Sequence, residues 1–297
     1  MKKLFAALAA ALLLVTIFAG CGQPPVVAEE PAIAETTAAT ETSVPEETAA
    51  PTLEPVELIV FAAASMTESM NQIADLYRKI APNVTVLYNF DSSGTLKTQI
   101  QEGADCDIFI SAGQKQMNQL DKAADPAVNT EGLDFVLNGS RFDIVSNTVV
   151  MIVPEDSDKG ITSFEDVMTD RIDLVALGNS DVPVGQYSEE IYTNLGLWEK
   201  LIKSGKVSFG TNVKEVLSQV ASGSVDCGIV YSTDAATAKG IMVAATAPAG
   251  SHKAITYPAA ILNCTKNQVA AEDFVAFLKT DACGKVLTNI GFALPER

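Results

Sequence analysis

The stretch LIVFAAASMTESM, residues 58–70, decides the fold that we expect for this chain. Its apolar run ends in three alanines and Ser65, and apolar residues then recur at steps of three and four, which is the period of a helix. We therefore expect a buried strand that ends at about Ala63 and a helix that begins at about Met66. Ser65 is the expected N-cap, since Glu68 three residues later would complete a capping box. Free amides at such a helix start attract anions.

The composition is that of a large acidic protein. The chain has 297 residues, 47% of them hydrophobic, and a formal net charge of −17. That length and apolar content suffice for one large core or for two lobes. Binding of a nucleic acid needs clustered Lys and Arg, so the acidic balance argues against such a partner. It also argues against long-range attraction of a small anion, so an anion site here must rely on local dipoles and hydrogen bonds.

The first 20 residues have the pattern of a secretory signal peptide. Two lysines at positions 2 and 3 precede an apolar run from Leu4 to Phe18, as in such signals. Ala19 and Gly20 before Cys21 resemble the bacterial lipoprotein cleavage box, although Phe18 stands where Leu is usual. The predicted product is acylated at Cys21 and tethered to the outside of the cytoplasmic membrane. An ordinary cleaved signal peptide with an incidental cysteine is the alternative.

Residues 21–55 have the composition of a linker. They are rich in Ala, Thr, Glu and Pro and have no periodic apolar face. Such a segment cannot bury enough surface to fold. We expect a disordered spacer between the lipidated cysteine and a folded part that begins near Val56.

Four further cysteines, at positions 106, 227, 264 and 283, match no metal-binding spacing. An extracytoplasmic protein can pair its cysteines, and four of them allow three connectivities that sequence does not separate. The pair Cys264 and Cys283 is the first to test, because both lie in the C-terminal part. Four free buried thiols are the alternative.

From Val56 onward, short apolar strands alternate with helical stretches. This order is typical of parallel sheets covered by helices. The strands are too many for one sheet, so we predict an α/β fold of two lobes with a ligand cleft between them. Lobe I is expected over residues 56–147 and 254–297, and lobe II over residues 148–253, with two crossovers joining them.

Three local expectations bear on the cleft. A helix is expected over Lys115–Ala123, followed by an irregular surface excursion over residues 125–142. Residues 178–185 are expected to form a turn, because they combine Gly, Asn, Ser, Asp and Pro. A helix should follow from about Gln186.

Four strand-to-helix turns share the design of the opening stretch. They are Ala64-Ser65, Ser92-Ser93-Gly94, Val182-Pro183-Val184-Gly185 and Thr211-Asn212-Val213. Ligands of open α/β sheets lie beyond the carboxyl ends of the strands, and each helix N-terminus carries roughly half a positive charge. Two turns from each lobe would thus make a cleft that attracts an anion without Lys or Arg. Ser65 and Ser93 would add hydroxyl donors and Tyr231 a phenol, although each is also explained as a helix cap or a packing residue.

Six motifs together resemble the molybdate-binding proteins of ABC-type importers. They are FAAASMTESM, SSGTL, DIFISAGQKQM, GNSDVPVGQY, GIVYSTDA and SHKAITYP, in that family's order across about residues 58–258. The resemblance implies a periplasmic-binding-protein fold and an oxyanion held by hydrogen bonds from neutral groups. It also implies a monomeric substrate-binding lipoprotein without a cofactor, whose partners are a membrane permease and its ATPase.

The resemblance also implies the ligand-contacting residues. Carried over motif by motif, Ser65 and Ser93 are hydroxyl donors, Val184 and Val213 donate through their backbone amides, and Tyr231 is a phenol donor. Val184 stands where the family often has Ala, which leaves the N–H unchanged. Gly94 replaces a frequent serine, and the stretch over 126–139 departs from the usual length, but neither removes one of these positions.

The chemistry of the donors narrows the ligand. Phosphate keeps a proton at neutral pH and needs an acceptor, yet no matched position is acidic, although Asp91 and Asp181 lie nearby. A fully deprotonated dianion is therefore favoured, which leaves molybdate, tungstate and sulfate, and the resemblance favours the first two. A receptor for sulfate or another small solute, and a sensor that signals to a membrane partner, are the alternatives.

Neither an enzyme nor a metal site is expected. His252 is the one histidine, and we expect it to be an exposed residue at a crossover. The chain has no nucleophile elbow, P-loop or dinucleotide fingerprint. It also lacks the His and Cys clusters that zinc sites usually need.

Overall fold

The computed structural model describes residues 54–295. The predicted signal peptide over 1–20, the lipidation site Cys21 and nearly all of the linker over 21–55 lie outside the described residues and stay predictions. Among residues 54–295, no helix is long and apolar enough to cross a membrane.

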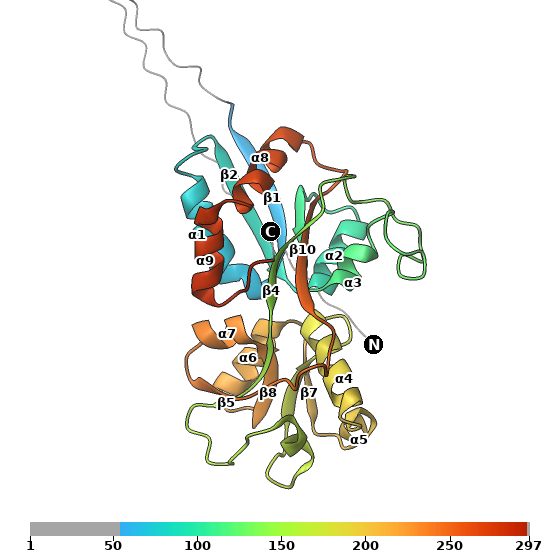
Figure 1. Ribbon diagram of the computed structural model, residues 1–297, viewed down its shortest axis with the longest axis vertical. Helices are drawn as coiled ribbons and strands as arrows, with labels where there is room; N and C mark the ends of the chain where they lie inside the picture. The colour runs from blue at the N-terminus through green and yellow to red at the C-terminus, as the bar shows by residue number, and fades with distance from the viewer. Residues whose placement is uncertain (1–53, 296–297) are drawn as a thin grey trace, which may run out of the picture. The chain divides into compact units, whose positions relative to one another are not determined.

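The first sheet has five strands in the order β2-β1-β3-β10-β4. Strand β1 pairs in parallel with β2 and β3, whereas β10 is antiparallel to β3 and β4. Helices α1, α8 and α9 gather on one side of this sheet and α2 and α3 on the other (Figure 1). The bounds are β1 Val56–Ala63, α1 Thr67–Tyr77, β2 Val84–Asp91, α2 Ser93–Gln101, β3 Ile108–Ile110, α3 Gln114–Asn118, β4 Phe142–Asn147, β10 Ile255–Ile261, α8 Gln268–Leu278 and α9 Asp281–Ile290.

The second sheet has five strands in the order β7-β6-β8-β5-β9. Strand β6 pairs in parallel with β7 and β8, and β5 is antiparallel to β8 and β9. Helices α4 and α6 both pack against β6 and β8. The bounds are β5 Val149–Pro154, β6 Val175–Gly178, α4 Pro183–Asn194, α5 Trp198–Lys203, β7 Val207–Gly210, α6 Val213–Ala221, β8 Cys227–Tyr231, α7 Ser232–Thr237 and β9 Ile241–Thr246, with 3-10 turns at Ala64–Met66 and Phe164–Met168.

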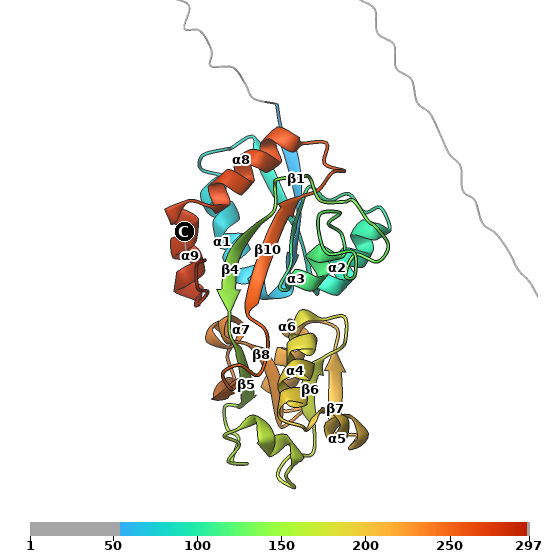
Figure 2. The same ribbon diagram turned by 45° about the vertical axis from the view of Figure 1, so that its right-hand side comes forward.

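The chain passes between the two sheets twice, directly from β4 into β5 and again from β9 to β10. Figure 2 shows β4 and β10 lying side by side where they lead toward the second sheet. The predicted α/β fold with two sheets and two crossovers is confirmed. We call the first sheet with its helices lobe I and the second sheet with its helices lobe II. The predicted residue limits of the lobes, 56–147 with 254–297 and 148–253, stay a prediction.

The strands and helices follow from the apolar pattern. Strand β5 is the clearest case, because Val149 to Val153 form an unbroken apolar run and all are buried, as expected for a strand covered on both faces. Helix α6 buries Val213, Val216 and Val220 on one face. Full burial of such a side chain contributes about 1.5–3 kcal/mol to folding.

Strand β1 ends at Ala63, as predicted, but the prediction that Ser65 caps the next helix is wrong. A 3-10 turn of three residues separates β1 from α1, and α1 starts without a side-chain cap. The hydroxyl of Ser65 instead lies 2.9 Å from that of Tyr257, and Glu68 pairs with Lys214. Partners far away in the sequence thus replace the expected capping box.

Helix α4 begins at Pro183 rather than at Gln186, because proline suits the first position of a helix. Gly185, expected in the turn, lies inside the helix. A Cβ at Gly185 would lie 2.2 Å from the carbonyl oxygen of Asn179, so only glycine lets α4 pack this closely against the end of β6. Val184 therefore lies in the first turn of a helix, where amides have no intrahelical partner.

Strand β4 and helix α5 were missed by the sequence patterns, because both are short and mix polar with apolar residues. Helix α3 ends at Asn118 rather than Ala123. Beyond it, Arg141 pairs with Asp121 and also donates to Asn118. These bonds tie the irregular stretch over 125–142 to the end of α3.

The four cysteines are free, so the pairing of Cys264 with Cys283 is not formed. Cys106, Cys227 and Cys283 are buried, and Cys264 is exposed. The thiol of Cys264 lies 3.3 Å from the carbonyl oxygen of Cys106, which places it on the β3 side of lobe I.

Candidate functional site

The five residues predicted to contact a ligand line one cavity between the lobes. Its wall consists of Ala63, Ala64, Ser65, Asp91, Ser92, Ser93, Ala112, Val182, Pro183, Val184, Val213 and Tyr231. We call it the junction cavity. Its cavity volume is about 10 Å³, far below the ~300–1,000 Å³ of pockets for drug-sized ligands. The cavity therefore suits an ion of a few atoms.

Lobe I contributes hydroxyl groups at the ends of β1 and β2. Ser65 and Ser93 are buried. The oxygen of Ser93 accepts a hydrogen bond of 2.9 Å from the amide of Ala112, which leaves the hydroxyl proton of Ser93 available. The cap of α2 is the neighbouring Ser92, whose oxygen accepts from the amide of Thr95. Ser93 is thus free of the capping role.

Lobe II contributes backbone amides at two helix starts. Val184 follows the first residue of α4, and Val213 is the first residue of α6. Amides at these positions have no intrahelical acceptor and lie at the positive end of the helix dipole. Both side chains are buried, so packing holds the amides in place.

Tyr231 ends β8 with its side chain in the cavity wall. It is 1% exposed, and its hydroxyl has no hydrogen-bond partner. Burial raises the pKa of this phenol well above its ordinary value, so the proton stays on the oxygen. A buried donor without an acceptor costs about 1–3 kcal/mol, and an anion in the cavity would remove that cost.

Asp91 lines the cavity itself, whereas the sequence placed it only near the predicted ligand contacts. Asp91, at the end of β2, is in the wall. Its Oδ1 accepts from the amide of Ser92 at 2.7 Å and from the side chain of Asn212 at 3.1 Å. Asp181 lies instead in an adjoining crevice.

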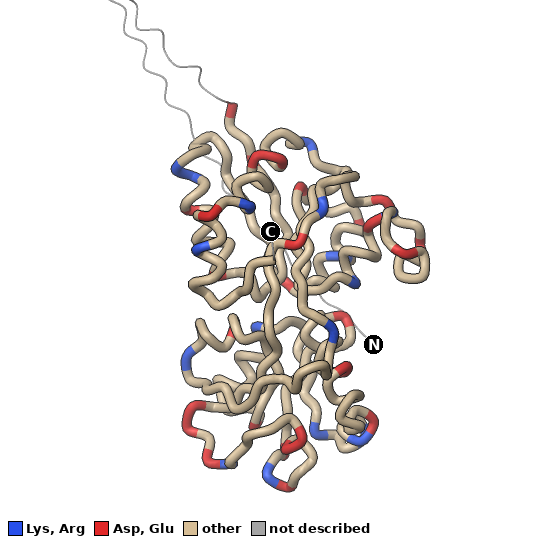
Figure 3. Tube along the Cα trace, in the orientation of Figure 1, with Lys and Arg blue, Asp and Glu red and all other residues tan. Residues whose placement is uncertain are grey.

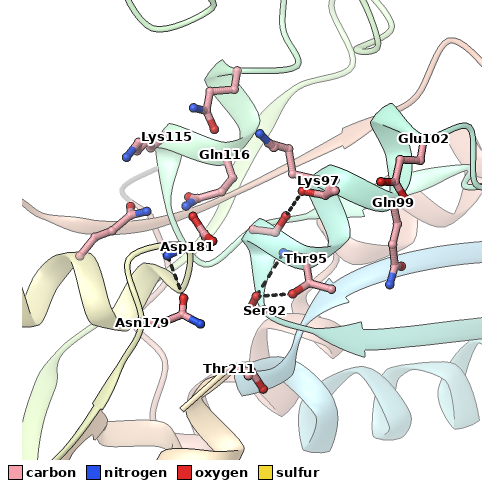
Figure 4. Close-up of a pocket in the computed structure, with 14 residues that line it drawn as sticks. Ser92, Thr95, Lys97, Gln99, Glu102, Lys115, Gln116, Asn179, Asp181 and Thr211 are labelled. Atoms are coloured by element: carbon pink, nitrogen blue, oxygen red, sulfur yellow. Dashed lines mark hydrogen bonds between the residues drawn. The ribbon is translucent and has the colours of Figure 1, made fainter. Parts of the chain in front are cut away.

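That crevice meets the junction cavity at Ser92. Figure 4 shows Ser92 and Thr95 of lobe I opposite Asn179, Asp181 and Thr211 of lobe II. Its lining is mostly polar and includes the side chains of Lys97 and Lys115.

A charged cluster around Lys214 bridges the lobes outside the wall of the cavity. The Lys214 ammonium of α6 lies 2.9 Å from Glu68 of lobe I and 3.0 Å from Asp234 of lobe II. Among the described residues, no Lys or Arg lines the junction cavity. Figure 3 shows Lys and Arg spread along both lobes. The cavity is therefore built from neutral donors and one carboxylate.

The two lobes also approach each other through backbone. A Cβ built on Gly94 in α2 would lie 2.2 Å from the carbonyl oxygen of Asp181 in lobe II. Asn212, just before Val213, reaches across to Asp91. The two lobes therefore contact each other directly beside the cavity. The role of Gly94 and Asn212 in bridging the lobes could not be predicted from the sequence, because nothing local distinguishes a glycine or an N-cap asparagine that faces the opposite lobe.

His252 lies outside the cavity. Its ring packs edge-on against Tyr187 and its Nδ1 lies 2.7 Å from the carbonyl oxygen of Lys253, and the residue is half-buried rather than exposed as predicted. Within residues 54–295, no group of three or more His, Cys, Asp or Glu side chains is placed to hold a metal ion.

Comparison with known proteins links this architecture to a family. The family model of the bacterial extracellular solute-binding protein matches residues 58–293. The molybdate-binding protein ModA of Haemophilus influenzae is 36% identical over 241 residues, which cover 80% of this chain and 90% of that protein. YvgL of Bacillus subtilis, assigned as a substrate-binding lipoprotein of an ABC transporter, is 34% identical over 80% of this chain and 86% of its own length.

A solved structure shows the same arrangement. The periplasmic molybdate-binding protein of Azotobacter vinelandii superimposes with a TM-score of 0.70 at 25% sequence identity. The match covers 80% of this chain and 100% of that one. The two-lobed fold of periplasmic binding proteins is thereby shown for the folded part of this chain.

The buried carboxyl of Asp234 should make the stability of the ligand-free protein depend on pH. Burial raises the pKa of its carboxyl to about 6, and Lys214 limits the rise. The folded protein thus keeps a proton that the unfolded chain loses from about pH 4, so the free energy of unfolding should fall as the pH rises from about 4 to about 6. Asp234→Asn should lack this fall when urea unfolding is measured across that range.

Asp75→Asn, which removes an exposed carboxylate of lobe I, is the control. The wild-type protein should lose stability relative to Asp234→Asn toward neutral pH. A relative gain over the same interval would contradict the assignment of Asp234 as a buried carboxyl that resists ionisation.

Proposed function

The chain belongs to the family of bacterial extracellular solute-binding proteins, and from this membership we propose that it captures molybdate outside the cytoplasm for an ABC importer. Proteins of this kind bind and release their solute unchanged, so the chain is not an enzyme. The observation that carries the proposal is the junction cavity, where Ser65, Ser93, Val184, Val213 and Tyr231 meet. The similarity to molybdate-binding proteins supports the choice of solute.

The donors of the cavity suit a fully deprotonated tetrahedral oxyanion. Two hydroxyls, two helix-start amides and one phenol supply hydrogen bonds from both lobes, and hydrogen bonds to a charged partner are worth about 1.5–3 kcal/mol each. Neutral donors neutralise no charge, so the anion remains a dianion when bound. Tungstate has the same charge and shape as molybdate, and we propose that it binds as well.

Closure follows from the placement of the donors. Because the serines lie on lobe I and the amides on lobe II, the anion can satisfy all of them only when the lobes are together. We propose that the closed form docks on a membrane permease with its ATPase. We further propose that the protein works as a monomer held to the membrane through a lipid on Cys21, with residues 21–55 as the spacer.

Calorimetric titration tests the solute. Molybdate and tungstate should bind tightly, sulfate more weakly and phosphate least, because phosphate brings a proton into a cavity of donors. Asp91 is the one carboxylate in the wall, but its Oδ1 already accepts from Ser92 and Asn212, so Asp91→Asn should leave the phosphate result unchanged. Tight binding of phosphate without binding of molybdate would overturn the proposal.

The two serines should each matter for affinity. Ser65→Ala and Ser93→Ala should each weaken molybdate binding by about 1–3 kcal/mol, since each leaves a buried charge short of one donor. Ser69→Ala is the matched control, because that serine is also buried but donates to the carbonyl of Met66. Wild-type affinity in both cavity variants would remove them from the site.

Gly94→Ala should hold the lobes apart. The added methyl group would meet the backbone of Asp181, so molybdate binding should weaken by about 1–3 kcal/mol, the usual cost of overpacking. Small-angle scattering with saturating molybdate should show a larger radius of gyration than in the wild type.

Gly284→Ala on α9 is the control, since its methyl group would meet only the end of the Leu294 side chain. Equal affinity and equal size of Gly94→Ala and wild type would show that the lobes do not close at this contact.

A further inference from the structure

Ser65 is one end of a chain of hydrogen bonds that runs from the cavity to the crossover and into lobe II. Ser65 Oγ lies 2.9 Å from Tyr257 Oη, and Asn147 Nδ2 lies 3.2 Å from the same oxygen. Asn147 is the last residue of β4. Its Nδ2 also lies 2.9 Å from Thr233 Oγ1, and its Oδ1 accepts from Ser232 at 3.0 Å. Tyr257 is fully buried, so its hydroxyl must find its hydrogen-bond partners within the protein.

The backbone fixes which way the Asn147 amide points. The N–H of Thr148 lies 2.8 Å from Asn147 Oδ1. A backbone N–H can only donate, so the atom that it meets must be the amide oxygen. The amide nitrogen therefore faces Tyr257 and Thr233, and its two hydrogens serve those two oxygens.

The orientation of the Asn147 amide decides the role of the Tyr257 hydroxyl. Its oxygen receives a hydrogen from Asn147, and its own hydrogen has Ser65 Oγ as its acceptor. Burial and the nearby Asp234 carboxylate raise the pKa of Tyr257 well above its ordinary value, so the phenol keeps its proton. Leaving that hydrogen without an acceptor in a buried place would cost about 1–3 kcal/mol.

Ser65 therefore accepts from Tyr257 and keeps its own hydrogen for another partner. That hydroxyl is 3% exposed and lies in the wall of the junction cavity, so the cavity is where the hydrogen finds an acceptor. The hydroxyl of Ser93 is also left with its hydrogen to donate, because its oxygen accepts a hydrogen bond directly from the amide of Ala112. With the unpartnered phenol of Tyr231, all three polar side chains predicted to contact the ligand present hydrogens.

We propose that Tyr257 and Asn147 are positioning residues that hold Ser65 as a hydrogen-bond donor and so make the cavity select a fully deprotonated oxyanion over a protonated one. The inference rests on the proposed function. We call the chain from Asn147 through Tyr257 to Ser65 the relay. A serine free to turn could offer either lone pair to the hydroxyl of hydrogenphosphate, whereas the relay occupies one lone pair of Ser65 and leaves its hydrogen for the cavity. Asp91 is the one carboxylate in the wall, and its Oδ1 is already occupied by Ser92 and Asn212.

Two substitutions change the hydrogen bond between Tyr257 and Ser65 while nearly preserving the size of the side chains. One removes this bond and the other reverses its direction. Tyr257→Phe deletes the phenol oxygen and keeps the ring that packs edge-on against Tyr231 and Phe292. Asn147→Asp keeps the acceptor for Thr148 but turns the donor toward Tyr257 into an acceptor. The Tyr257 hydrogen then goes to the new carboxylate, and Ser65 must donate to Tyr257 and show its lone pair to the cavity.

The measurement is the ratio of the affinities for molybdate and hydrogenphosphate, by calorimetry at about pH 8, where phosphate has lost its second proton. The two anions then carry the same charge and differ by one hydrogen, so damage to the fold or added charge shifts both affinities together. Tyr257→Phe should lower molybdate affinity about three- to tenfold and lower the ratio. Asn147→Asp should lower the ratio further.

Tyr187→Phe is the matched control, because Tyr187 also packs on Tyr231 but is outside the relay. Its ratio should equal that of the wild type. An unchanged ratio in Tyr257→Phe, with normal molybdate binding by the wild type, would overturn the relay, and this variant decides alone should Asn147→Asp not fold. Absence of molybdate binding by the wild type would overturn the proposed function and the relay with it.

Discussion

A doubly charged ion taken out of water must be surrounded by hydrogen-bond donors, because a buried charge without partners is far too costly to keep. The junction cavity meets this demand with hydroxyls, a phenol and helix-start amides rather than with a lysine or arginine. Lys214, beside it, is already paired with Glu68 and Asp234. The proposed specificity therefore rests on which atoms carry hydrogens, and the surrounding structure serves to fix those hydrogens.

That demand explains why the site needs two lobes. A single strand-to-helix turn offers only a few donors, so turns from both sheets must converge on a small cavity. The convergence requires close backbone contact, which Gly94 permits against Asp181 and Gly185 permits against the end of β6. The same junction carries Asn212 and Lys214 on either side of Val213, and both reach lobe I. The contacts between the lobes and the proposed contacts to the ligand thus involve the same few residues.

The sequence predicted the architecture and the converging residues better than their local roles. Apolar periodicity placed the end of β1 at Ala63, and the family resemblance selected Val184 and Val213, which no side-chain chemistry would have suggested. The prediction of Ser65 as a helix cap was wrong, because its oxygen bonds to Tyr257, which is 192 residues away. The position of Asp91 in the wall was missed for a similar reason. Local patterns report propensity, whereas these contacts depend on how the two lobes meet.

The central claim is tested most directly by the anomalous scattering of molybdenum in crystals grown with molybdate. The account predicts one strong peak in the junction cavity, within hydrogen-bonding reach of the hydroxyls of Ser65 and Ser93, the amides of Val184 and Val213 and the phenol of Tyr231. A peak in the neighbouring crevice beside Lys97 and Lys115, with none in the cavity, would contradict it.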